Sequence, residues 1–278
     1  MDPDSEVEKS TSKIVAPFLI ALLFTACESY KEQNEVFPAE KEQHSGSLKE
    51  NKTDSNLLKA KTIYFTFDDG PNKGTGMVLK VAAEEKIPIS MFFIGTQLHG
   101  SLAQMRLFKQ VKQNPLVEIV NHSYTHAHNH FDNFYRNPGE VIADFSRAED
   151  SLGLHEKIVR TPGRNIWRTA QISSTDLKKC EPSADSLYKA GYTAVGWDVE
   201  WTFNNRLKLT KTTQQMLDKV DSFFSKNETK TPGHLVLLAH DQSFADSTDA
   251  ASLKNFIEQL KNSGRYQFEM ISKYPGLK

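Results

Sequence analysis

The sequence predicts an α/β protein whose mainly parallel sheet closes into a barrel. Three observations support this fold class. About seven short apolar runs alternate with helical patterns over residues 61–278. The runs are almost continuously apolar, which is typical of strands that are covered on both faces. With so many strand–helix units a barrel is the expected closure, and its chemistry is then expected at the carboxyl ends of the strands.

The predicted strands are rich in β-branched, aromatic and other apolar residues. In chain order they are 62–67, 89–95, 116–120, 157–160, 192–198, 234–240 and 266–271. The predicted helices between them are 77–86, 102–113, 138–152, 183–191, 210–226 and 252–262. Pro138 fits the first position of its helix, and Gly191 closes the helix that ends there. Residues 165–183 show neither pattern for most of their length and are predicted to form a loop.

The composition is that of a soluble globular protein. The chain has 278 residues, of which 38% are hydrophobic and 25% charged, and its formal net charge is -1. This balance gives no indication of nucleic-acid binding. Two cysteines, Cys27 and Cys180, do not make a disulfide scaffold. We expect a monomer in which Cys180 is structural.

The N-terminal 26 residues predict a signal peptide. The apolar run 14–26 follows two lysines and is shorter than the roughly 20 residues that a transmembrane helix needs. It ends in Leu-Phe-Thr-Ala before Cys27, which resembles a lipobox, so Cys27 is a candidate lipidation site. A signal peptide cut near Ala26 with an incidental cysteine is the alternative. Either interpretation predicts an exported protein of the bacterial cell envelope, with contact to a membrane only through a lipid anchor.

Residues 27–60 are predicted to be a flexible linker. They are rich in Glu, Lys, Gln, Ser and Asn and contain few large apolar residues. Such a segment cannot bury enough apolar surface to fold alone. The expected organisation is therefore a signal peptide over 1–26, a linker over 27–60 and one folded domain over 61–278.

Charged and imidazole side chains follow the predicted strands at one end. In chain order they are Asp68, Asp69, His122, His126, Arg160, Asp198, His240 and Asp241. The carboxyl ends of parallel strands meet on the same rim of a barrel. We therefore expect these side chains to lie close together.

The pair His122 and His126 predicts a metal site. If the loop that carries them takes one helical turn, the spacing of four residues points both imidazoles the same way. Two histidines and one carboxylate make a three-ligand site for Zn²⁺ or a similar divalent ion such as Co²⁺, with a position left open for water. One aspartate of the Asp68–Asp69 pair would bind the ion and the other would act as a base. His128 and His130, nearby, are further candidate ligands, although histidines at such spacings also occur as surface residues.

The motifs TFDDGP, HSYTH, RTPGR, GWD and LLAHD, in this order, resemble the five motifs of the polysaccharide deacetylase family, also called the NodB homology domain or carbohydrate esterase family 4. The resemblance covers about residues 61–270. It implies a distorted, NodB-like barrel of about seven βα units. It also implies a metal-dependent hydrolase that removes N-acetyl groups from a polysaccharide and releases acetate.

The resemblance assigns a role to each motif residue. Asp68 would be the catalytic base, and Arg160 would orient it. Asp69, His122 and His126 would hold the metal. Asp198 and His240 would form the acid pair that protonates the leaving nitrogen, and Leu238 would line the pocket for the acetyl methyl group.

The third motif departs from the family pattern of Arg-Pro-Pro-aromatic-Gly. Here Gly163 stands at the aromatic position and Arg164 replaces the glycine. In that family the backbone N–H at the aromatic position helps to hold the oxyanion, and the resemblance implies the same role for the N–H of Gly163. Trp167 and Trp197 are candidates for surfaces that contact the sugar, with core packing as the alternative for each.

Three other functions remain to be weighed. An O-acetyl xylan esterase would use the same site, and a degenerate domain would only bind glycans. A phosphoaspartate hydrolase needs an aspartate two positions after its nucleophile, and Gly70 occupies that place. The sequence leaves the polymer open among peptidoglycan, chitin-like oligomers, exopolysaccharide and xylan.

Overall fold

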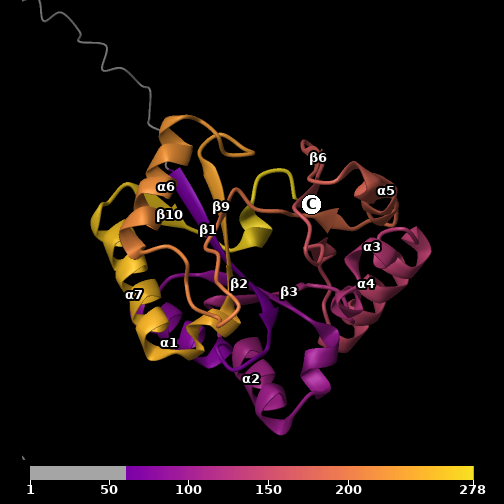
Figure 1. Cartoon of the computed structure of the whole chain (residues 1–278), viewed down its shortest axis with the longest axis horizontal. Coiled ribbons are helices and arrows are strands. Elements are labelled where there is room, and N and C mark those ends of the chain that lie inside the picture. The colour runs from indigo at the N-terminus through magenta and orange to yellow at the C-terminus, as the bar shows by residue number, and fades with distance from the viewer. Residues whose placement is uncertain (1–60, 278) are drawn as a thin grey trace, which may run out of the picture. The chain divides into compact units, whose positions relative to one another are not determined.

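A computed structural model gives the structure of residues 61–277. The signal peptide predicted over 1–26, the candidate lipidation site Cys27 and the linker predicted over 27–60 lie outside these described residues. The described part is a mixed α/β domain, which confirms the predicted fold class (Figure 1).

The described residues form one curled sheet of short strands. The strands are β1 (Lys61–Gly70), β2 (Ile89–Phe93), β3 (Val117–Asn121), β4 (Ile158–Val159), β5 (Ile166–Arg168), β6 (Ser173–Thr175), β7 (Thr193–Ala194), β8 (Val199–Glu200), β9 (His234–His240) and β10 (Tyr266–Phe268). Their order is β6-β5-β7-β4-β3-β2-β1-β9-β8, and β10 pairs with the first residues of β1. The sheet is an open half-barrel, because β6 and β8 are its two edges.

Most strand pairs are parallel, as predicted. The exceptions are β5 with β6 and β5 with β7, which are antiparallel. The segment predicted to be the loop 165–183 therefore contains a short hairpin, and the structure corrects that prediction. Each of the two strands has only three residues, which is too short for a clear period in the sequence.

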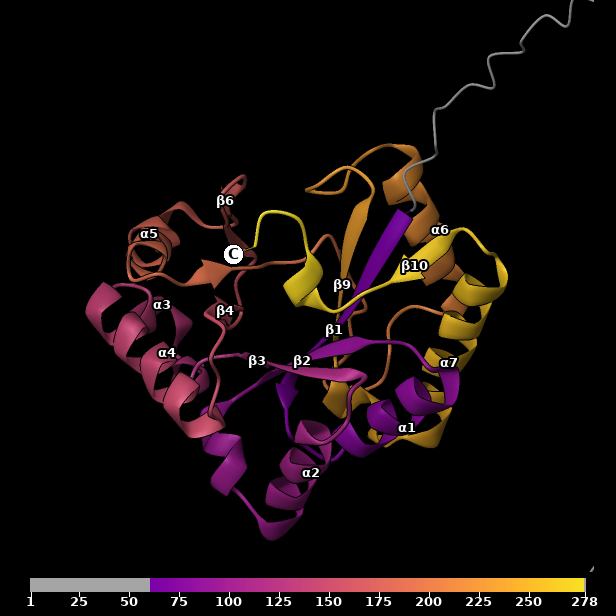
Figure 2. The same ribbon diagram turned by 180° about the vertical axis from the view of Figure 1, so that it is seen from behind.

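Helices surround the outside of the curl (Figures 1 and 2). They are α1 (Thr75–Glu85), α2 (Leu102–Lys112), α3 (Phe131–Phe134), α4 (Pro138–Leu152), α5 (Glu181–Lys189), α6 (Thr213–Ser225) and α7 (Ser247–Asn262). Pro138 is the first residue of α4, as predicted. Helix α6 begins after a capping box formed by Thr212 and Gln215. Helix α7 begins five residues earlier than predicted, because Asp246 caps it by accepting a hydrogen bond from the backbone N–H of Thr248.

Alternation along β1 determines which residues face the inside of the curl. Phe65 and Phe67 pack in the outer core that β1 shares with the helices. Tyr64, one residue out of phase with them, packs inside the curl against Tyr274 from the C-terminal segment. Because side chains alternate along a strand, Asp68 at the end of β1 also faces inward.

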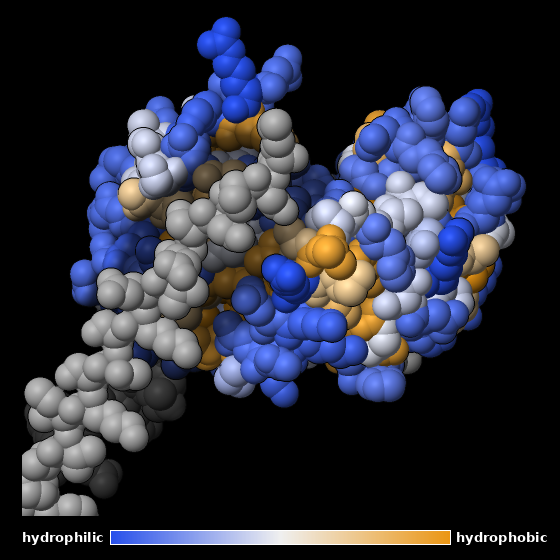
Figure 3. Space-filling model, turned by 90° about the horizontal axis from the view of Figure 1, so that it is seen from below, coloured by the Kyte–Doolittle hydropathy of each residue, from blue (hydrophilic) through white to orange (hydrophobic). Residues whose placement is uncertain are grey.

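The surface of the described residues is mostly polar. The face in Figure 3 is largely hydrophilic, with apolar residues in patches among polar ones. Within residues 61–277, no helix combines the length and hydrophobicity needed to cross a bilayer. Cys180 is a buried free thiol, in agreement with a structural role.

Candidate active site

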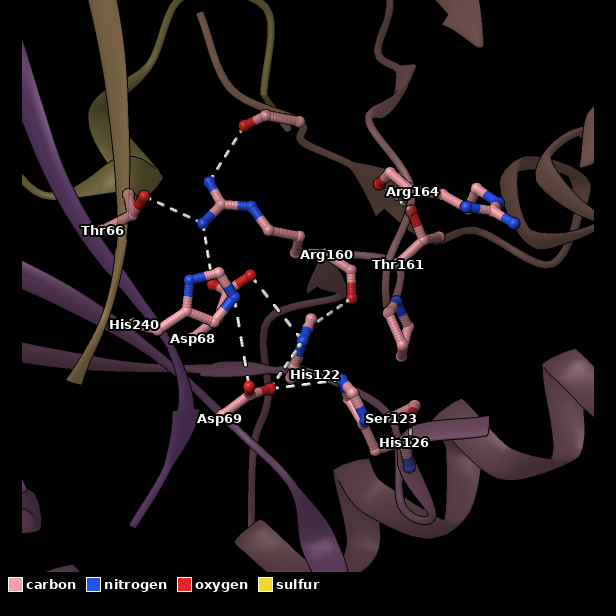
Figure 4. A network of polar contacts seen from close by, with 12 residues as sticks. Thr66, Asp68, Asp69, His122, Ser123, His126, Arg160, Thr161, Arg164 and His240 are labelled. Carbon is pink, nitrogen blue, oxygen red and sulfur yellow. Dashed lines mark hydrogen bonds and ion pairs between the residues drawn. The ribbon is translucent and has the colours of Figure 1, made fainter. Parts of the chain in front are cut away.

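The carboxyl ends of β1, β3, β4 and β9 bring most of the predicted residues together (Figure 4). Asp68 pairs in register with His240 of the neighbouring strand β9. His122 follows β3, and Arg160 follows β4. The prediction that these strand ends meet on one rim is therefore confirmed for Asp68, Asp69, His122, His126, Arg160 and His240.

The turn after β1 is held by a residue to which the sequence analysis gave no role. Asp69 has a φ of 71°, and the pairing of β1 with β2 shifts register between Asp68 and Gly70. The side-chain amide of Asn72 donates to the carbonyl of Asp69 over 3.0 Å. Asn72 and Thr75 both donate to the buried carboxyl group of Asp241. Asp241 thus ties the turn that presents Asp69 to the end of β9.

Burial raises the pKa of Asp241 to about 7, although its bonds to Thr75 and Asn72 act to lower it. A signal for this residue was present in the sequence. Asp241 directly follows His240, and Asn72 ends the run Asp-Asp-Gly-Pro-Asn, where an asparagine commonly stabilises a turn.

The loop after β3 brings its two histidines together by an unexpected backbone path. Ser123 and residues 126–129 all have positive φ angles, so the predicted ordinary helical turn is wrong. The backbone N–H of Ser123 donates to Asn121, and that of His126 donates to the Ser123 hydroxyl. Even so, the imidazole centroids of His122 and His126 lie 5.2 Å apart.

Helix α4 supports this loop from outside. The Asp144 carboxylate accepts hydrogen bonds from the backbone N–H groups of Tyr124 and Thr125, over 2.9 Å and 3.1 Å. The Arg147 guanidinium lies 3.7 Å from the centroid of the Tyr124 ring. These contacts offset part of the cost of the left-handed backbone.

Three atoms with available lone pairs converge between these loops. Asp69 Oδ1 lies 3.4 Å from Nε2 of His122 and 3.2 Å from Nε2 of His126. Nδ1 of His122 lies 3.0 Å from the carbonyl oxygen of Arg160. Because that carbonyl can only accept, Nδ1 carries the proton and the lone pair is on Nε2.

The same reasoning applies to His126. Its Nδ1 lies 3.0 Å from Oδ1 of Asn129, which fixes the same tautomer. Asp69 Oδ1 is buried and has no hydrogen-bond partner within residues 61–277. One carboxylate oxygen and two imidazole nitrogens, all within 4.8 Å of one another, suit Zn²⁺. The residues present therefore fit a divalent ion.

The pKa shifts of Asp69 and His126 also indicate a site for a cation. Burial acts to raise the pKa of Asp69, but interactions with His122 and His126 hold it well below its usual value. Burial acts to lower the pKa of His126, but Asp69 raises it overall. The cluster thus favours a cation, which is either a proton on His126 or a metal ion that displaces it.

Asp68 lies beside this cluster with a different partner. Its Oδ1 accepts a 2.8 Å hydrogen bond from Nη1 of Arg160, while its Oδ2 lies 3.7 Å from Nε2 of His122. Arg160 is fully buried and also donates to the hydroxyl of Thr66 and to the carbonyl of Gly196. The predicted contact between Arg160 and Asp68 is therefore present.

His240 lies close to the cluster but lacks its expected partner. Its Nε2 is 4.0 Å from Oδ2 of Asp69, and its ring meets Phe203 edge-on at 5.1 Å. Its Nδ1 is buried and has no hydrogen-bond partner among the described residues.

The structure corrects the predicted pairing of Asp198 with His240. The Asp198 carboxylate accepts hydrogen bonds from the backbone N–H groups of Lys230 and Val236, over 2.7 Å and 2.8 Å. Val236 is four residues before His240 on β9, roughly 13 Å along the strand. Burial raises the pKa of Asp198 to about 6 against the effect of these N–H groups. Asp198 therefore stabilises the backbone around β9.

Of the candidate substrate-contact residues, Leu238 and Trp197 lie beside the site and Trp167 does not. Leu238 is buried and lies in phase with His240 on β9, so it faces the site. Trp197 is partly exposed, and its ring centroid lies 5.9 Å from the Arg160 guanidinium. Trp167 is fully buried against Tyr274, so the structure supports the core-packing alternative and corrects its candidacy as a sugar-contact surface. It lies in β5, whose side chains are covered by the C-terminal segment and α5.

Gly163 lies at the edge of the site in a left-handed conformation, with a φ of 62°. The two other histidines of the loop after β3, His128 and His130, are exposed and lie outside the ligand cluster. The structure thus brings His122 and His126 together and leaves His128 and His130 at the surface.

Comparisons with known proteins agree with the motifs. Residues 56–177 match the family model described as polysaccharide deacetylase. The chain is 25% identical over 228 residues to a bifunctional xylanase/deacetylase of Pseudobutyrivibrio xylanivorans, covering 82% of this chain and 33% of that protein. It is 24% identical over 221 residues to a putative polysaccharide deacetylase, YheN, of Bacillus subtilis. This match covers 76% of this chain and 67% of that protein. A chitooligosaccharide deacetylase of Bradyrhizobium is 31% identical over 149 residues. This match covers 50% of this chain and 57% of that protein. The chain therefore spans from a third to two thirds of the length of these relatives.

Solved structures support the fold. A carbohydrate esterase of family 4 from Streptococcus mutans has a TM-score of 0.58 and 21% identity, covering 76% of this chain and 86% of its own. A family 4 carbohydrate esterase from Streptomyces lividans, in complex with acetate, has a TM-score of 0.54 and 22% identity. The match covers 78% of this chain and 95% of that one. The fold of residues 61–277 is thus the one that these esterases share.

Proposed function

We propose that this chain, a member of the polysaccharide deacetylase family, is a metal-dependent hydrolase that removes N-acetyl groups from a glycan. One observation carries the proposal. Asp69 Oδ1 and the Nε2 atoms of His122 and His126 converge, and the Asp68 carboxylate lies next to them. A ligand set beside a separately held carboxylate is what metal-assisted hydrolysis requires.

Asp69, His122 and His126 would hold the ion, which is expected to be Zn²⁺. When bound, the ion would supply a Lewis acid that polarises the acetyl carbonyl and activates water. Asp68 would accept the proton of the attacking water through Oδ2, because Oδ1 is engaged by Arg160. Arg160 would fix the direction of this carboxylate, since its guanidinium is itself held by Thr66 and Gly196.

Gly163 and His240 would act on the substrate itself. No residue within 61–277 accepts a hydrogen bond from the backbone N–H of Gly163, which leaves this donor free for the oxyanion. His240 would hold a proton at Nε2, the nitrogen that faces Asp69, and pass it to the leaving group. Leu238 would lie against the acetyl methyl group.

A second candidate, O-acetyl ester hydrolysis, is favoured by the environment of His240. Its Nδ1 has no carboxylate partner in the described residues. An amide nitrogen must be protonated before it leaves, whereas an alkoxide leaves with less help from an acid. A His240 ring that no carboxylate orients would assist the leaving group less, and this would impair amide hydrolysis more than ester hydrolysis. The relatives include both a chitooligosaccharide deacetylase and a xylanase/deacetylase.

The test uses protein stripped with a chelator and reloaded with a measured amount of zinc. Acetate release is followed on N-acetylated chitin oligomers and on O-acetylated xylan. We expect release that requires zinc, and its loss in His122→Ala together with the bound metal. His128→Ala is the matched control, because His128 is on the same loop but exposed. Zinc-replete protein that releases no acetate from either substrate would overturn the proposal.

A further inference from the structure

An aromatic ring from another part of the chain fills the space beside Gly163. A Cβ atom on Gly163 would lie 3.0 Å from both Cε1 and Cζ of Phe131. The Phe131 ring also meets the His126 imidazole edge-on, with centroids 5.5 Å apart. Phe131, the first residue of α3, thus forms the wall between a candidate metal ligand and the third motif, which has no aromatic residue of its own.

Positive charge lies on the other side of this wall. The Arg164 guanidinium is 5.9 Å from the centroid of the Phe131 ring. It points away from the cluster formed by Asp69, His122 and His126 (Figure 4). Its Nη1 donates to the carbonyl of Gly163 over 2.8 Å. The guanidinium therefore cannot touch an acetyl group at the metal ligands, but it is within reach of a neighbouring sugar.

The cations around Arg164 outnumber the carboxylates. Asp132 lies 2.8 Å from Nζ of Lys179 and 3.4 Å from Nη2 of Arg164. Lys179, Arg164 and Arg136 together lower the pKa of Asp132, so three positive charges act on one carboxylate. A second carboxylate, Asp176, belongs to the same surroundings, because Asp176 and Arg164 both act on Tyr135 and Cys180.

There is room for a ligand at this place. A shallow pocket of about 380 Å³ is lined by Arg164 and by the five consecutive residues 129–133. Asn129, which orients His126, is at one end of that segment, so the pocket adjoins the candidate metal site.

We propose that Arg164, with Lys179 and Arg136 around it, forms a subsite that binds a carboxylate on the sugar next to the one that is deacetylated. Phe131 supplies the apolar face between the two sugars. A planar guanidinium can bind a carboxylate through two parallel hydrogen bonds, and the excess positive charge compensates for desolvation of the anion. The preferred glycan is then acidic, with a carboxylate-bearing sugar beside an N-acetylated one. This inference rests on the proposed function for its activity measurement but not for its binding measurement.

The binding measurement needs no turnover. Chelator-treated protein is titrated in a calorimeter with three tetrasaccharides. The first is chitotetraose, which is neutral. The second alternates N-acetylglucosamine with N-acetylmuramic acid and has free lactyl carboxylates. The third is its methyl ester, which has the same sugars without the charge. We expect the free acid to bind about tenfold more tightly than its ester, in line with a charged hydrogen-bonded contact.

Variants then assign the preference to residues. Arg164→Gln should remove most of the tenfold difference, and Arg164→Lys should retain part of it, because charge remains while the planar fork is lost. Lys179→Gln, at an exposed residue, should reduce the difference without a risk to folding. Arg106→Gln is the matched control, since Arg106 is an exposed arginine on α2. Thermal unfolding of each variant shows that it is folded.

The outcomes separate the two proposals. If the acid binds better than its ester but no acetate is released, the subsite stands and the proposed hydrolase function fails. If acid, ester and chitotetraose bind equally, or if none of them binds, the subsite is wrong. An equal loss of affinity for acid and ester in Arg164→Gln would show that Arg164 only supports the backbone at Gly163. With active enzyme, the same variant should lower the ratio of acidic to neutral kcat/KM about tenfold.

Discussion

Arg160 donates a hydrogen bond of 2.8 Å from Nη1 to Oδ1 of Asp68, and both side chains are buried. Three further acceptors fix the guanidinium: the hydroxyl of Thr66 and the carbonyls of Val195 and Gly196. The direction of the Asp68 carboxylate is therefore set by the protein before any ligand binds. Its second oxygen, Oδ2, faces His122, and this is the place where a base for metal-assisted hydrolysis would be needed.

The first prediction concerns Asp68→Asn. An amide can still accept a hydrogen bond from Arg160, but it cannot take a proton from water. We expect acetate release to fall by about 100-fold or more, in line with general-base contributions. Zinc content, measured by elemental analysis, should stay at the parent level because Asp69 and the two histidines are unchanged. Parental turnover in this variant would show that Asp68 is not the base.

The second prediction contrasts Asp198 with His240. The Asp198 carboxylate bonds to two backbone N–H groups and does not contact His240. Asp198→Asn is therefore expected to lower stability by roughly 1–3 kcal/mol and to change the turnover of folded protein by less than about threefold. His240→Ala should lower turnover by about 100-fold with little change in stability.

Denaturant unfolding and kcat, measured on the same preparations, check this contrast. Because burial raises the pKa of Asp198 to about 6, both variants are compared at pH 7 and above, where the carboxylate is ionised. If Asp198→Asn reduced kcat as strongly as His240→Ala at unchanged stability, the acid pair predicted from the family resemblance would be restored.

The strands that form the centre of the sheet could be predicted from the sequence because they are long and apolar. Strands β1, β2 and β9 are buried on both faces, so their runs of apolar residues are unmistakable. The hairpin of β5 and β6 could not be predicted, because its strands are short and one of them, Ser173–Thr175, is polar. The choice between a sugar-contact surface and core packing for Trp167 could not be made from the sequence, because its burial depends on the C-terminal segment, which is more than a hundred residues away.

The candidate site was predictable in its membership but not in its geometry. Side chains that follow parallel strands share one rim, so the approach of His122 to Asp69 follows from topology. The left-handed path through residues 126–129 does not, because these residues are not glycines and positive φ angles are uncommon for them. That path depends on Asn121, Ser123 and Asp144, which the loop sequence alone does not identify as supports.

The third prediction is a pH dependence of stability from Asp241. Its pKa is raised by burial from an ordinary value of 3.8 to about 7. The folded state therefore binds more protons than the unfolded state between these values. The stability that this provides is fully present below about pH 3.8 and is lost as the pH rises through about 7. The loss has an upper bound of about 4 kcal/mol.

Asp241→Asn removes this titration. In metal-free protein, the free energy of unfolding of the variant minus that of the parent should become more positive from pH 4 to pH 8, as measured by urea unfolding. Asp246→Asn is the control. The pKa of Asp246 is lowered by Lys208 and by the N-terminal N–H groups of α7, so its contribution is present above its ordinary pKa and should be constant over this range. Parallel curves for parent and Asp241→Asn would contradict a raised pKa in the folded state.

The last prediction concerns the contact of Gly163 with Phe131. Alanine at Gly163 meets two penalties, a φ of 62° and a Cβ atom 3.0 Å from the Phe131 ring. Gly264 is a matched control, because its φ is 64° and nothing lies within 4 Å of the Cβ position. We expect Gly264→Ala to lower the free energy of unfolding by about 1 kcal/mol through its backbone conformation alone. Gly163→Ala should lower it by about 1 kcal/mol more, because its Cβ atom also overpacks against the ring.

The additional cost should depend on the ring. In a Phe131→Ala background, Gly163→Ala should cost no more than Gly264→Ala, which a double-mutant cycle of urea unfolding measures. Gly163→Ala should also lower turnover more when the Phe131 ring is present than in the Phe131→Ala background. The backbone shift that relieves the contact with the ring also moves the proposed oxyanion donor at Gly163. If the cost of Gly163→Ala is the same with and without the Phe131 ring, then Phe131 does not form the wall of the site beside the third motif.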